Sequence, residues 1–455
     1  MKKKHSLNRE KTFNSLWGLI FMIYFCLGIM PVNINNLLLS LPGTTKLGIG
    51  ICSISYLFVT SISLLLFGYY EDKITEINLR KKLFIFTNLI WVIVYGFIFI
   101  SPNFQFYLLF IIIGAIGIGA FVPIGYSIIS DFYSPKERGK KYGSINSGLI
   151  LGTGAGILVG GFLGNYAGPN GWRFAYAIGF IFGLLTVFNF ILKAEDPKRG
   201  QAEPEFKDFE ENFIYDYKIN IKRIGLLLRR KSVSSILIYT LFSGIAVSTI
   251  SYWGIFYLTL RFNGIFEELS ATALYLLTGV GVLPGTLLGG KFGDFLYHSG
   301  KIRGRIYLSV LGLISGIVCL MIFYLLPISA TSQLEITIFW IILFIIGFCG
   351  YFLVSLSIGN VFAIYSEVNV PEARSAANSL HQVMINTGGI FGNLVFAGLI
   401  ERNISLLPNA MFFLFLFWLI GTSLWIIAYT YYPIEFKKIR ELMFERKKEL
   451  ELNLN

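Results

Sequence analysis

Long apolar segments separated by short polar ones run along most of this 455-residue chain. The hydrocarbon core of a bilayer is about 30 Å thick, so a helix that crosses it needs roughly 20 mostly apolar residues. Twelve segments meet this requirement, at residues 15–41, 46–70, 83–101, 103–130, 142–167, 171–193, 233–261, 268–296, 306–327, 334–365, 375–400 and 407–432. The pattern therefore predicts an all-α membrane protein with twelve transmembrane helices.

Composition and charge placement agree with this prediction. Of all residues, 55% are hydrophobic and 14% are charged, and the mean hydropathy is +0.67. If both termini are in the cytoplasm, 34 of the 38 Lys and Arg residues lie in cytoplasmic segments, a bias that sets the orientation of a membrane protein. We therefore expect a multi-pass protein of the cell membrane with both termini cytoplasmic. The four external exceptions are Lys46, Arg173, Arg261 and Arg402.

The net charge of +12 then belongs to loops that face anionic lipid headgroups. We expect membrane lipids, and not nucleic acid, as the partner of this charge. The basic start from Met1 to Lys4 precedes a long apolar run without a small-residue cleavage site. This pattern favours an uncleaved first span over a signal peptide.

The sequence repeats itself at an offset of 236 residues. The matching pairs are Pro135 and Pro371, Arg138 and Arg374, Gly152 and Gly388, and Gly156 and Gly392. Such a repeat indicates two pseudo-symmetric six-helix bundles. We expect an N-terminal bundle at 1–193, a cytoplasmic linker with a surface helix at 194–232, a C-terminal bundle at 233–433 and a basic cytoplasmic tail, helical over 435–450, at 434–455.

Glycines in the fifth and eleventh predicted spans recur at helical spacing. A helix face without side chains lets another helix backbone approach closely. We therefore expect these glycines to be packing residues: Gly152, Gly156, Gly160, Gly388 and Gly392.

Two Gly-x-x-x-Asp motifs, Gly68 to Asp72 and Gly290 to Asp294, each end a span and precede a basic cluster. They resemble the loop motif of the major facilitator superfamily, and the resemblance covers nearly the whole chain. Within that superfamily, residues 195–200, with the sequence EDPKRG, look like the spinster-type branch, whose members move lysolipids and related amphiphiles. The glycines of the fifth span are similar to a motif of proton-linked exporters, although Ile157 stands where that motif has proline.

The resemblance implies a conformational latch on the cytoplasmic side. Asp72 would face the start of the eleventh span near Arg374, and Asp294 would face the fifth span near Arg138. Glu71 stands where the family has a small apolar residue, so either Glu71 or Asp72 makes the first contact. The alternative is that these charges only cap helices and fix topology. The latch candidates are Gly68, Asp72, Lys73, Arg138, Gly290, Asp294 and Arg374.

The substrate cavity, as the resemblance implies, lies between the halves and is lined by spans 1, 4, 7 and 10. Its polar candidates are Asn33, Asn36, Tyr126, Ser248, Tyr252, Trp253, Ser355 and Asn360. No Lys or Arg lies near the middle of a span, which argues against paired-arginine recognition of an anion. A small neutral or amphipathic organic or lipid-like substrate fits this pattern better.

A proton pathway is not evident from the carboxylates, because all 26 Asp and Glu residues fall in loops, at helix ends or in the linker. An intramembrane charge is usually functional, so this placement argues against a simple buried-carboxylate relay. His381 is the coupling candidate, with Gln382 and Asn386 as expected partners. The alternative is an ordinary interior histidine.

These observations predict a secondary transporter that works by alternating access, with lysolipid or drug-like export as first choice. Facilitated or ion-coupled uptake of a neutral nutrient is the alternative, and a transporter-like sensor is a third. We expect no enzyme activity, no cofactor and no metal site, and a monomer. The cysteines read as small core residues without metal-ligand spacing: Cys26, Cys52, Cys319 and Cys349.

Overall fold

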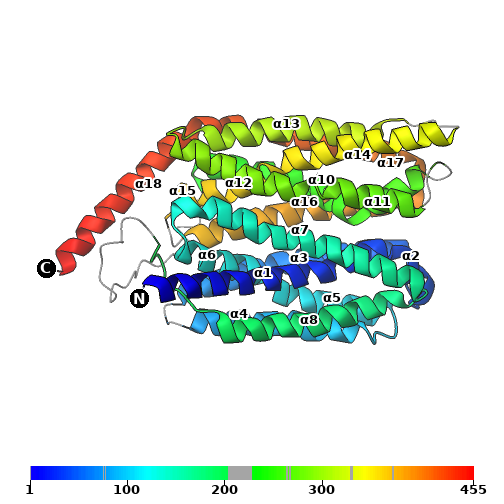
Figure 1. Cartoon of the computed structure of the whole chain (residues 1–455), viewed down its shortest axis with the longest axis horizontal. Helices are drawn as coiled ribbons and strands as arrows, with labels where there is room; N and C mark the ends of the chain where they lie inside the picture. The colour runs from blue at the N-terminus through cyan, green and yellow to red at the C-terminus, as the bar shows by residue number, and fades with distance from the viewer. Residues whose placement is uncertain are drawn as a thin grey trace.

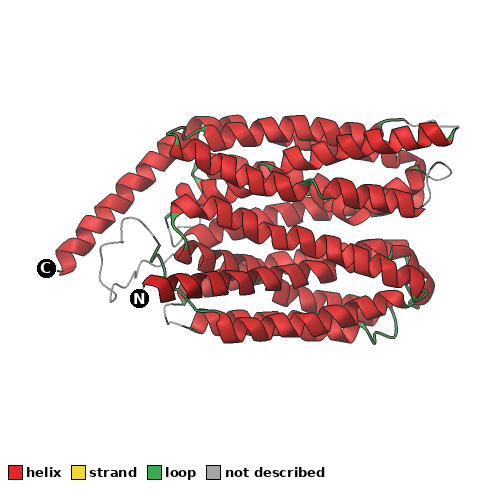
Figure 2. Ribbon diagram, viewed as in Figure 1, coloured by secondary structure: helices red, strands yellow, loops and turns green. Residues whose placement is uncertain are grey.

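The computed structural model is helical throughout the residues that it describes (Figure 2), with no strand among them. These residues are 2–74, 76, 78–202, 228–262, 265, 268–327, 332–370 and 373–454. Twelve helical segments are long and apolar enough to cross a membrane. They follow one another in the order that the hydrophobic pattern predicts, which confirms the all-α membrane fold.

The first half of the chain contains α1 Lys2–Val32, α2 Ile34–Ser40, α3 Lys46–Lys73, α4 Leu79–Ile98, α5 Phe104–Gly119, a π-helix Phe121–Gly125, α6 Tyr126–Phe132, α7 Pro135–Tyr166 and α8 Gly171–Lys193. The second half contains α10 Lys231–Arg261, α11 Glu268–Gly279, α12 Val282–His298, α13 Gly304–Leu325, α14 Gln333–Ser355, α15 Ile358–Glu367, α16 Arg374–Arg402, a 3-10 turn Ile404–Leu406, α17 Leu407–Ser423 and α18 Trp425–Leu454.

The two halves lie side by side with their helices roughly parallel to one long axis (Figure 1). Both chain termini lie at one end of the bundle, which we call the terminal end; the opposite end is the far end. Lys46, Arg173, Arg261 and Arg402, expected outside, all belong to helix ends at the far end. The predicted tail helix is confirmed as the continuation of α18, whereas the predicted surface helix of the linker, at 219–228, lies outside the described residues except for its last residue.

Two spans are broken at equivalent points of the repeat. α5 ends at Gly119 and α14 ends at Ser355, which are 236 residues apart. In the first half a π-helix that contains Pro123 follows the break, because proline lacks the N–H that a regular turn needs. The break turns α6 and α15 towards the centre of the molecule at the terminal end, where they carry much of the site described below.

Glycines bring α7 against α1 and α16 against α10 at close range. A methyl group on Gly152 would overlap the carbonyl oxygen of Phe21, and one on Gly156 would overlap that of Phe25. Gly388 and Gly392 meet the backbone of α10 in the same way, at Leu241, Gly244 and Ile245. Gly160 lies against Ile29 of α1 and against Asn33, which precedes α2. Each half is thus built around one pair of closely packed helices.

Candidate functional site

A buried arginine gathers three carboxylates at the terminal end of the first half. Arg80, at the start of α4, is 4% exposed. Its guanidinium nitrogens lie 2.8 Å from Asp131 of α6, 2.7 Å from Asp196 and 3.4 Å from Glu71 of α3. Charge-assisted hydrogen bonds of this kind are strong when desolvated, and a buried charge needs such partners.

The loop after α8 completes this cluster. The carbonyl of Pro197 accepts a hydrogen bond from Arg80 at 2.8 Å, and Arg199 donates to both the carboxylate and the backbone carbonyl of Glu71 at 2.8 Å. The backbone N–H of Gly200, at a φ of 73°, donates to Asp131 at 2.9 Å. The spinster-like segment 195–200 is therefore a docked part of the N-terminal half, bonded to residues of α3, α4 and α6.

The second half has an equivalent cluster, which a different part of the chain completes. Arg305 at the start of α13 lies 2.8 Å from Asp294 of α12 and 3.2 Å from Glu367 of α15. Glu367 and Asp131 occupy the same position of the 236-residue repeat. The hydroxyl of Tyr432 in α18 donates to Glu367. α18 thus completes this cluster, whereas the loop after α8 completes the first one.

The halves meet at the terminal end through α7 and α12. The backbone N–H of Lys140, in the first turns of α7, donates a hydrogen bond to the Asp294 carboxylate. A methyl group on Gly143 would lie 3.3 Å from the carbonyl oxygen of Thr286 in α12. The hydroxyl groups of Tyr142 in α7 and Ser366 in α15 are 3.5 Å apart. The predicted proximity of Asp294 to the start of the fifth span is therefore present.

The other latch candidates take varied positions. Arg138 and Arg374 are both buried, and they donate to the backbone carbonyls of Ser130 at 2.7 Å and of Ser366 at 3.0 Å, which are again 236 residues apart. The Asp72 side chain lies outside the described residues. The expected contact with Arg374 therefore stays a prediction.

The remaining three latch candidates belong to α3 and α12. A methyl group on Gly68 would lie 3.1 Å from Ser379 Oγ of α16, so α3 approaches α16 closely at this point. Lys73 is exposed and lies over the ring of Tyr69 at 4.1 Å. Gly290 is buried in α12.

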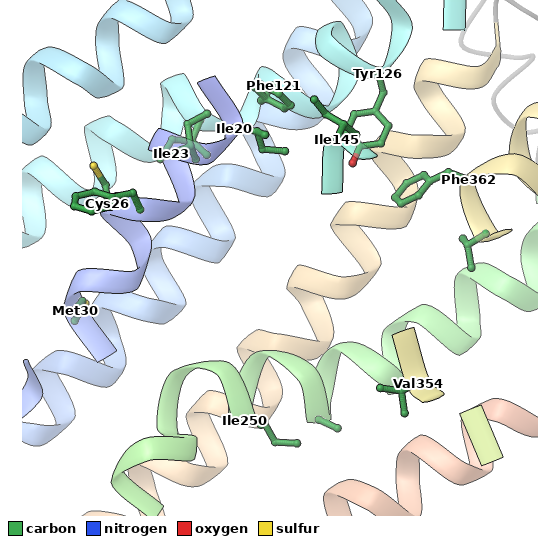
Figure 3. Packing of buried hydrophobic residues seen from close by; sticks show 14 of the residues in the cluster. Ile20, Ile23, Cys26, Met30, Phe121, Tyr126, Ile145, Ile250, Val354 and Phe362 are labelled. Atoms are coloured by element: carbon green, nitrogen blue, oxygen red, sulfur yellow. The ribbon is translucent and has the colours of Figure 1, made fainter. Parts of the chain in front are cut away.

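Aromatic rings close the interface between the terminal end and the middle of the bundle. The ring of Tyr126 in α6 lies 5.2 Å from that of Phe362 in α15 and 5.4 Å from that of Tyr142 in α7, measured between centroids. Figure 3 shows Tyr126 and Phe362 pointing towards one another across the interface. Because Tyr126 and Phe362 are themselves 236 residues apart, this contact lies on the pseudo-symmetry axis.

His381 of α16 is part of the same region. Its Nδ1 lies 3.1 Å from the hydroxyl oxygen of Thr240 and 3.2 Å from that of Tyr365. The prediction that Gln382 and Asn386 are the partners of His381 is wrong. These two side chains lie on the helix face towards α3 and bond to one another at 3.0 Å. His381 is buried against neutral groups, and its coupling role stays a prediction.

α3 and α16 contact each other along most of their length. Asn386 donates to Ser61 at 3.0 Å in the middle of the bundle, and Asn393 donates to Ser53 at 2.9 Å nearer the far end. Tyr252 of α10 donates to the backbone carbonyl of Ile49 at 2.7 Å. Together with the aromatic contacts, these bonds hold the two halves closed on both sides of the middle.

Four of the predicted substrate-binding residues lie at the interface between the halves. Tyr126 and Tyr252 make the contacts just described, and Trp253 lies against Gly50 of α3. Ser248 faces Gly389 of α16, close to Leu57 of α3.

The other four lie within one half. Asn33 and Asn36 bond to each other at 3.0 Å, and Asn33 packs on glycines of α7. Asn360 donates to the carbonyl of Gly289 at 3.1 Å and accepts from Arg305 at 3.3 Å, so its amide links α15 to α12 and α13. Ser355 packs on α12 at Gly285. The contacts of these four residues are internal to one half, and their role in substrate binding stays a prediction.

The middle of the interface is uncharged, whereas the buried ion pairs lie at the terminal end within each half. Hollows of about 410 and 380 Å³ lie elsewhere, on the outer face of α13 and beside the start of α4. In the part of the chain that the structure describes, no group of His, Cys, Asp or Glu side chains is arranged to hold a metal ion.

Sequence reasoning missed the two arginine clusters. It treated the residues after the first Gly-x-x-x-Asp motif only as a basic cluster, and segment 195–200 only as a mark of resemblance to the spinster-type branch. One signal was available, because Asp131 and Glu367 share the 236-residue register with Arg138 and Arg374. Carboxylates at equivalent helix ends of a repeat indicate a pair of equivalent ion-pair sites.

The family model of the Major Facilitator Superfamily matches residues 16–393, and the chain belongs to this family of transporters. Curated relatives include the protein spinster homolog 1 of Xenopus laevis, which is 25% identical over 77% of this chain and 64% of its own length. They also include the quinolone resistance protein NorA of Staphylococcus aureus, 29% identical over 45% of this chain and 49% of its own length.

The protein spinster of Drosophila melanogaster is 24% identical over 43% of this chain and 31% of its own length. The chain thus matches between about a third and two thirds of the length of these relatives. The predicted similarity to spinster proteins is confirmed.

Solved structures show the same fold. A bacterial homolog to the human lysosomal transporter Spinster, in an inward-facing and unoccupied conformation, superposes with a TM-score of 0.60 at 17% identity, over 98% of this chain and 99% of that one. The inward-facing and occupied form gives a TM-score of 0.56 at 17% identity, over 97% and 98% of the two chains. In the present structure the halves are in contact at the terminal end.

Proposed function

We propose that this transporter moves a small neutral or amphipathic organic solute between its two halves by alternating access, with lysolipid or drug-like export as first choice. The observation that supports the proposal is the uncharged middle of the interface, where Asn386 bonds to Ser61 next to the ring contact of Tyr126 and Phe362. A solute with a net charge would meet no compensating charge there, and burying an unpaired charge is costly. The name of one relative, a quinolone resistance protein, fits an organic substrate.

Two sets of contacts are suited to act as gates. At the terminal end the gate consists of the Lys140 to Asp294 hydrogen bond and the Tyr126 to Phe362 ring contact. Towards the far end it consists of the Tyr252 to Ile49 hydrogen bond. Rocking of one half against the other would break one set while the other stays closed, which is how a solute site becomes accessible from one side at a time.

The orientation is part of the proposal. Helix ends at the far end carry few basic residues, and the segments at the terminal end carry most of them. By the positive-inside rule the terminal end faces the cytoplasm of the cell membrane. The gate at Asp294 would then be the inner gate, and the gate at Tyr252 would be the outer one.

The test is flux of a labelled lysophosphatidylcholine across liposomes that contain the protein, with and without an imposed pH gradient. Protein-dependent flux supports the proposed substrate class, and dependence on the gradient indicates proton coupling. If lysolipid does not move, a panel of labelled neutral sugars and polyols tests the second candidate, nutrient uptake, which the same uncharged interface favours. Absence of flux for every solute together with saturable binding would indicate a sensor.

A further inference from the structure

Two buried polar atoms in the part of the interface nearer the far end have no hydrogen-bond partner in the described part of the chain. They are the indole Nε1–H of Trp253 in α10, a donor, and the amide Oδ1 of Asn393 in α16, an acceptor. Each side chain is 1% exposed. Nearly all buried polar groups in proteins are paired, because an unpaired one loses its hydration without compensation. A donor and an acceptor unpaired in the same region therefore require an explanation.

Both residues lie against the same turn of α3. The Asn393 amide nitrogen donates to Ser53 at 2.9 Å. A methyl group on Gly50, one turn before Ser53, would lie 3.8 Å from the Trp253 ring and 2.7 Å from Ala397, which is one turn after Asn393. α10 and α16 of one half thus place Trp253 and Asn393 against one turn of α3 from the other half.

This point lies at similar depth on both helices. Trp253 is eight residues before the end of α10 and Asn393 is nine before the end of α16, so each is roughly 12–14 Å from the far end at 1.5 Å per residue. The Tyr252 bond to Ile49 lies beside it. A solute that enters between the halves from the far end would meet Trp253 and Asn393 once this bond is broken.

The hydrogen-bonding capacity of Trp253 and Asn393 determines which solute group can pair with both. An indole N–H only donates, and an amide oxygen only accepts. A hydroxyl group satisfies both at once, because its oxygen accepts from Trp253 and its hydrogen is donated to Asn393. We propose that Trp253 and Asn393 form a polar subsite for an uncharged hydroxyl group of the solute, an inference that rests on the proposed function above.

The subsite also links the solute to the conformation. When the halves separate, both groups can bond to bulk water, whereas in the closed arrangement no group of the described part of the chain pairs with them. A hydroxyl-bearing solute therefore stabilises the closed arrangement relative to the open ones. A ligand shifts a conformational equilibrium only by such a difference in affinity between the states.

The experiment measures equilibrium binding of radiolabelled 1-lauroylglycerol, an uncharged amphiphile with free hydroxyls, to the full-length protein in lipid nanodiscs. The same measurement is made with its dimethyl ether, which keeps the oxygens and loses the donors. Wild type is expected to prefer the glyceride by about tenfold, since one desolvated hydrogen bond changes affinity by that order. Asn393→Leu should reduce the preference to about twofold or less, because only the glyceride can donate to Asn393. Trp253→Phe should weaken the binding of both lipids by a similar factor, because both keep the oxygen that accepts from Trp253.

A matched control is present in the same half. Trp425 also has a buried indole N–H without a partner among the described residues, but its ring packs edge-on against Tyr239 of α10 inside the C-terminal half. Trp425→Phe should therefore keep the affinity for each lipid and the tenfold preference. Unchanged melting temperatures of Trp253→Phe and Asn393→Leu would show that a loss of affinity or preference is local.

Several results would overturn the subsite: equal affinity of wild type for both lipids, no binding of either, or an equal loss in Trp425→Phe. The outcome is separable from that of the flux assay. Flux without a hydroxyl preference overturns the subsite and leaves transport intact. A hydroxyl preference without flux of any solute supports the subsite and overturns transport.

Discussion

Arg80 shows how much a single buried side chain can hold together at the residue scale. Carboxylates from α3, α6 and the loop after α8 all converge on it. Removing one partner of a buried ion pair leaves the others charged, desolvated and uncompensated. We therefore expect Arg80→Ala to lower the free energy of unfolding by about 3–5 kcal/mol, measured by denaturant unfolding in detergent.

Lys82 is the control, because it lies on the same helix and is exposed. Lys82→Ala should change the free energy of unfolding by less than about 0.5 kcal/mol. Similar losses in the two variants would contradict the structural role of the Arg80 cluster.

His381 allows a second prediction at this scale. Its ring nitrogen faces the hydroxyls of Thr240 and Tyr365, and no carboxylate is among its partners in the described structure. A proton taken up there would place an unpaired charge among neutral groups, which is unfavourable. We expect His381→Gln to leave the ratio of flux with and without a pH gradient unchanged. A ratio that falls to one while flux persists would show that His381 couples transport to protons.

Residue types alone could not separate the interface residues from the internal ones. Tyr252 and Asn360 look equally suited to a cavity in the sequence, yet Tyr252 bonds across the interface and Asn360 bonds within its half. The difference depends on the rotation of each helix about its axis. That rotation is set by packing between helices distant in sequence, such as α7 on α1, and not by local pattern.

At the scale of the elements, the contact of α12 with the start of α7 is the clearest candidate gate. Asp294 accepts from the backbone N–H of Lys140, near the positive end of the α7 dipole. Asp294→Asn weakens this attraction, so the halves should open more often at the terminal end. A Ser366→Cys reporter, in a background without Cys26, Cys52, Cys319 and Cys349, should then react several-fold faster with a hydrophilic maleimide added to the protein in detergent, because Ser366 is buried beside Tyr142.

Glu401→Gln is the control, since Glu401 is exposed at the far end. It should leave the labelling rate unchanged. The gate assignment fails if Asp294→Asn labels at the wild-type rate, or if both variants accelerate labelling equally.

Helix pairing within each half provides another test. A methyl group on Gly156 would overlap the Phe25 carbonyl of α1, whereas Gly154 on the same helix has no neighbour within 4 Å of that position. Gly156→Ala should therefore destabilise the protein by about 1–3 kcal/mol through overpacking. Gly154→Ala should be neutral or stabilising by up to about 1 kcal/mol, as measured by thermal unfolding. Equal melting temperatures for the two variants would contradict the packing.

The positions of the transmembrane helices could be predicted from the hydrophobic pattern, because a helix that spans a bilayer has a nearly fixed length. The breaks after Gly119 and Ser355 do not follow from it, since the apolar run continues through both. Pro123 gave a local hint for the first break, but no proline follows the second at the same place. Their shared register becomes evident only when the two halves are compared in space.

At the scale of the whole molecule, the repeat predicts both the two bundles and where equivalent chemistry lies. Arg80 with Asp131 and Arg305 with Glu367 are equivalent ion pairs. They differ in the segment that completes each cluster, which is the loop at 195–200 in one half and Tyr432 of α18 in the other. A duplicated sequence can thus indicate two sites, but the segments that follow each bundle differ and their docking could not be predicted.

Transport through the interface between the halves is the central claim, and it requires α3 and α16 to move relative to each other. Ser61 and Asn386 are in hydrogen-bond contact at the middle of this pair. The most direct measurement is flux of labelled lysophosphatidylcholine in liposomes that contain the Ser61→Cys and Asn386→Cys double variant, before and after disulfide formation and again after reduction. We predict flux in the reduced protein, loss on oxidation and recovery on reduction. Protein-dependent flux that persists with the halves cross-linked would contradict the account.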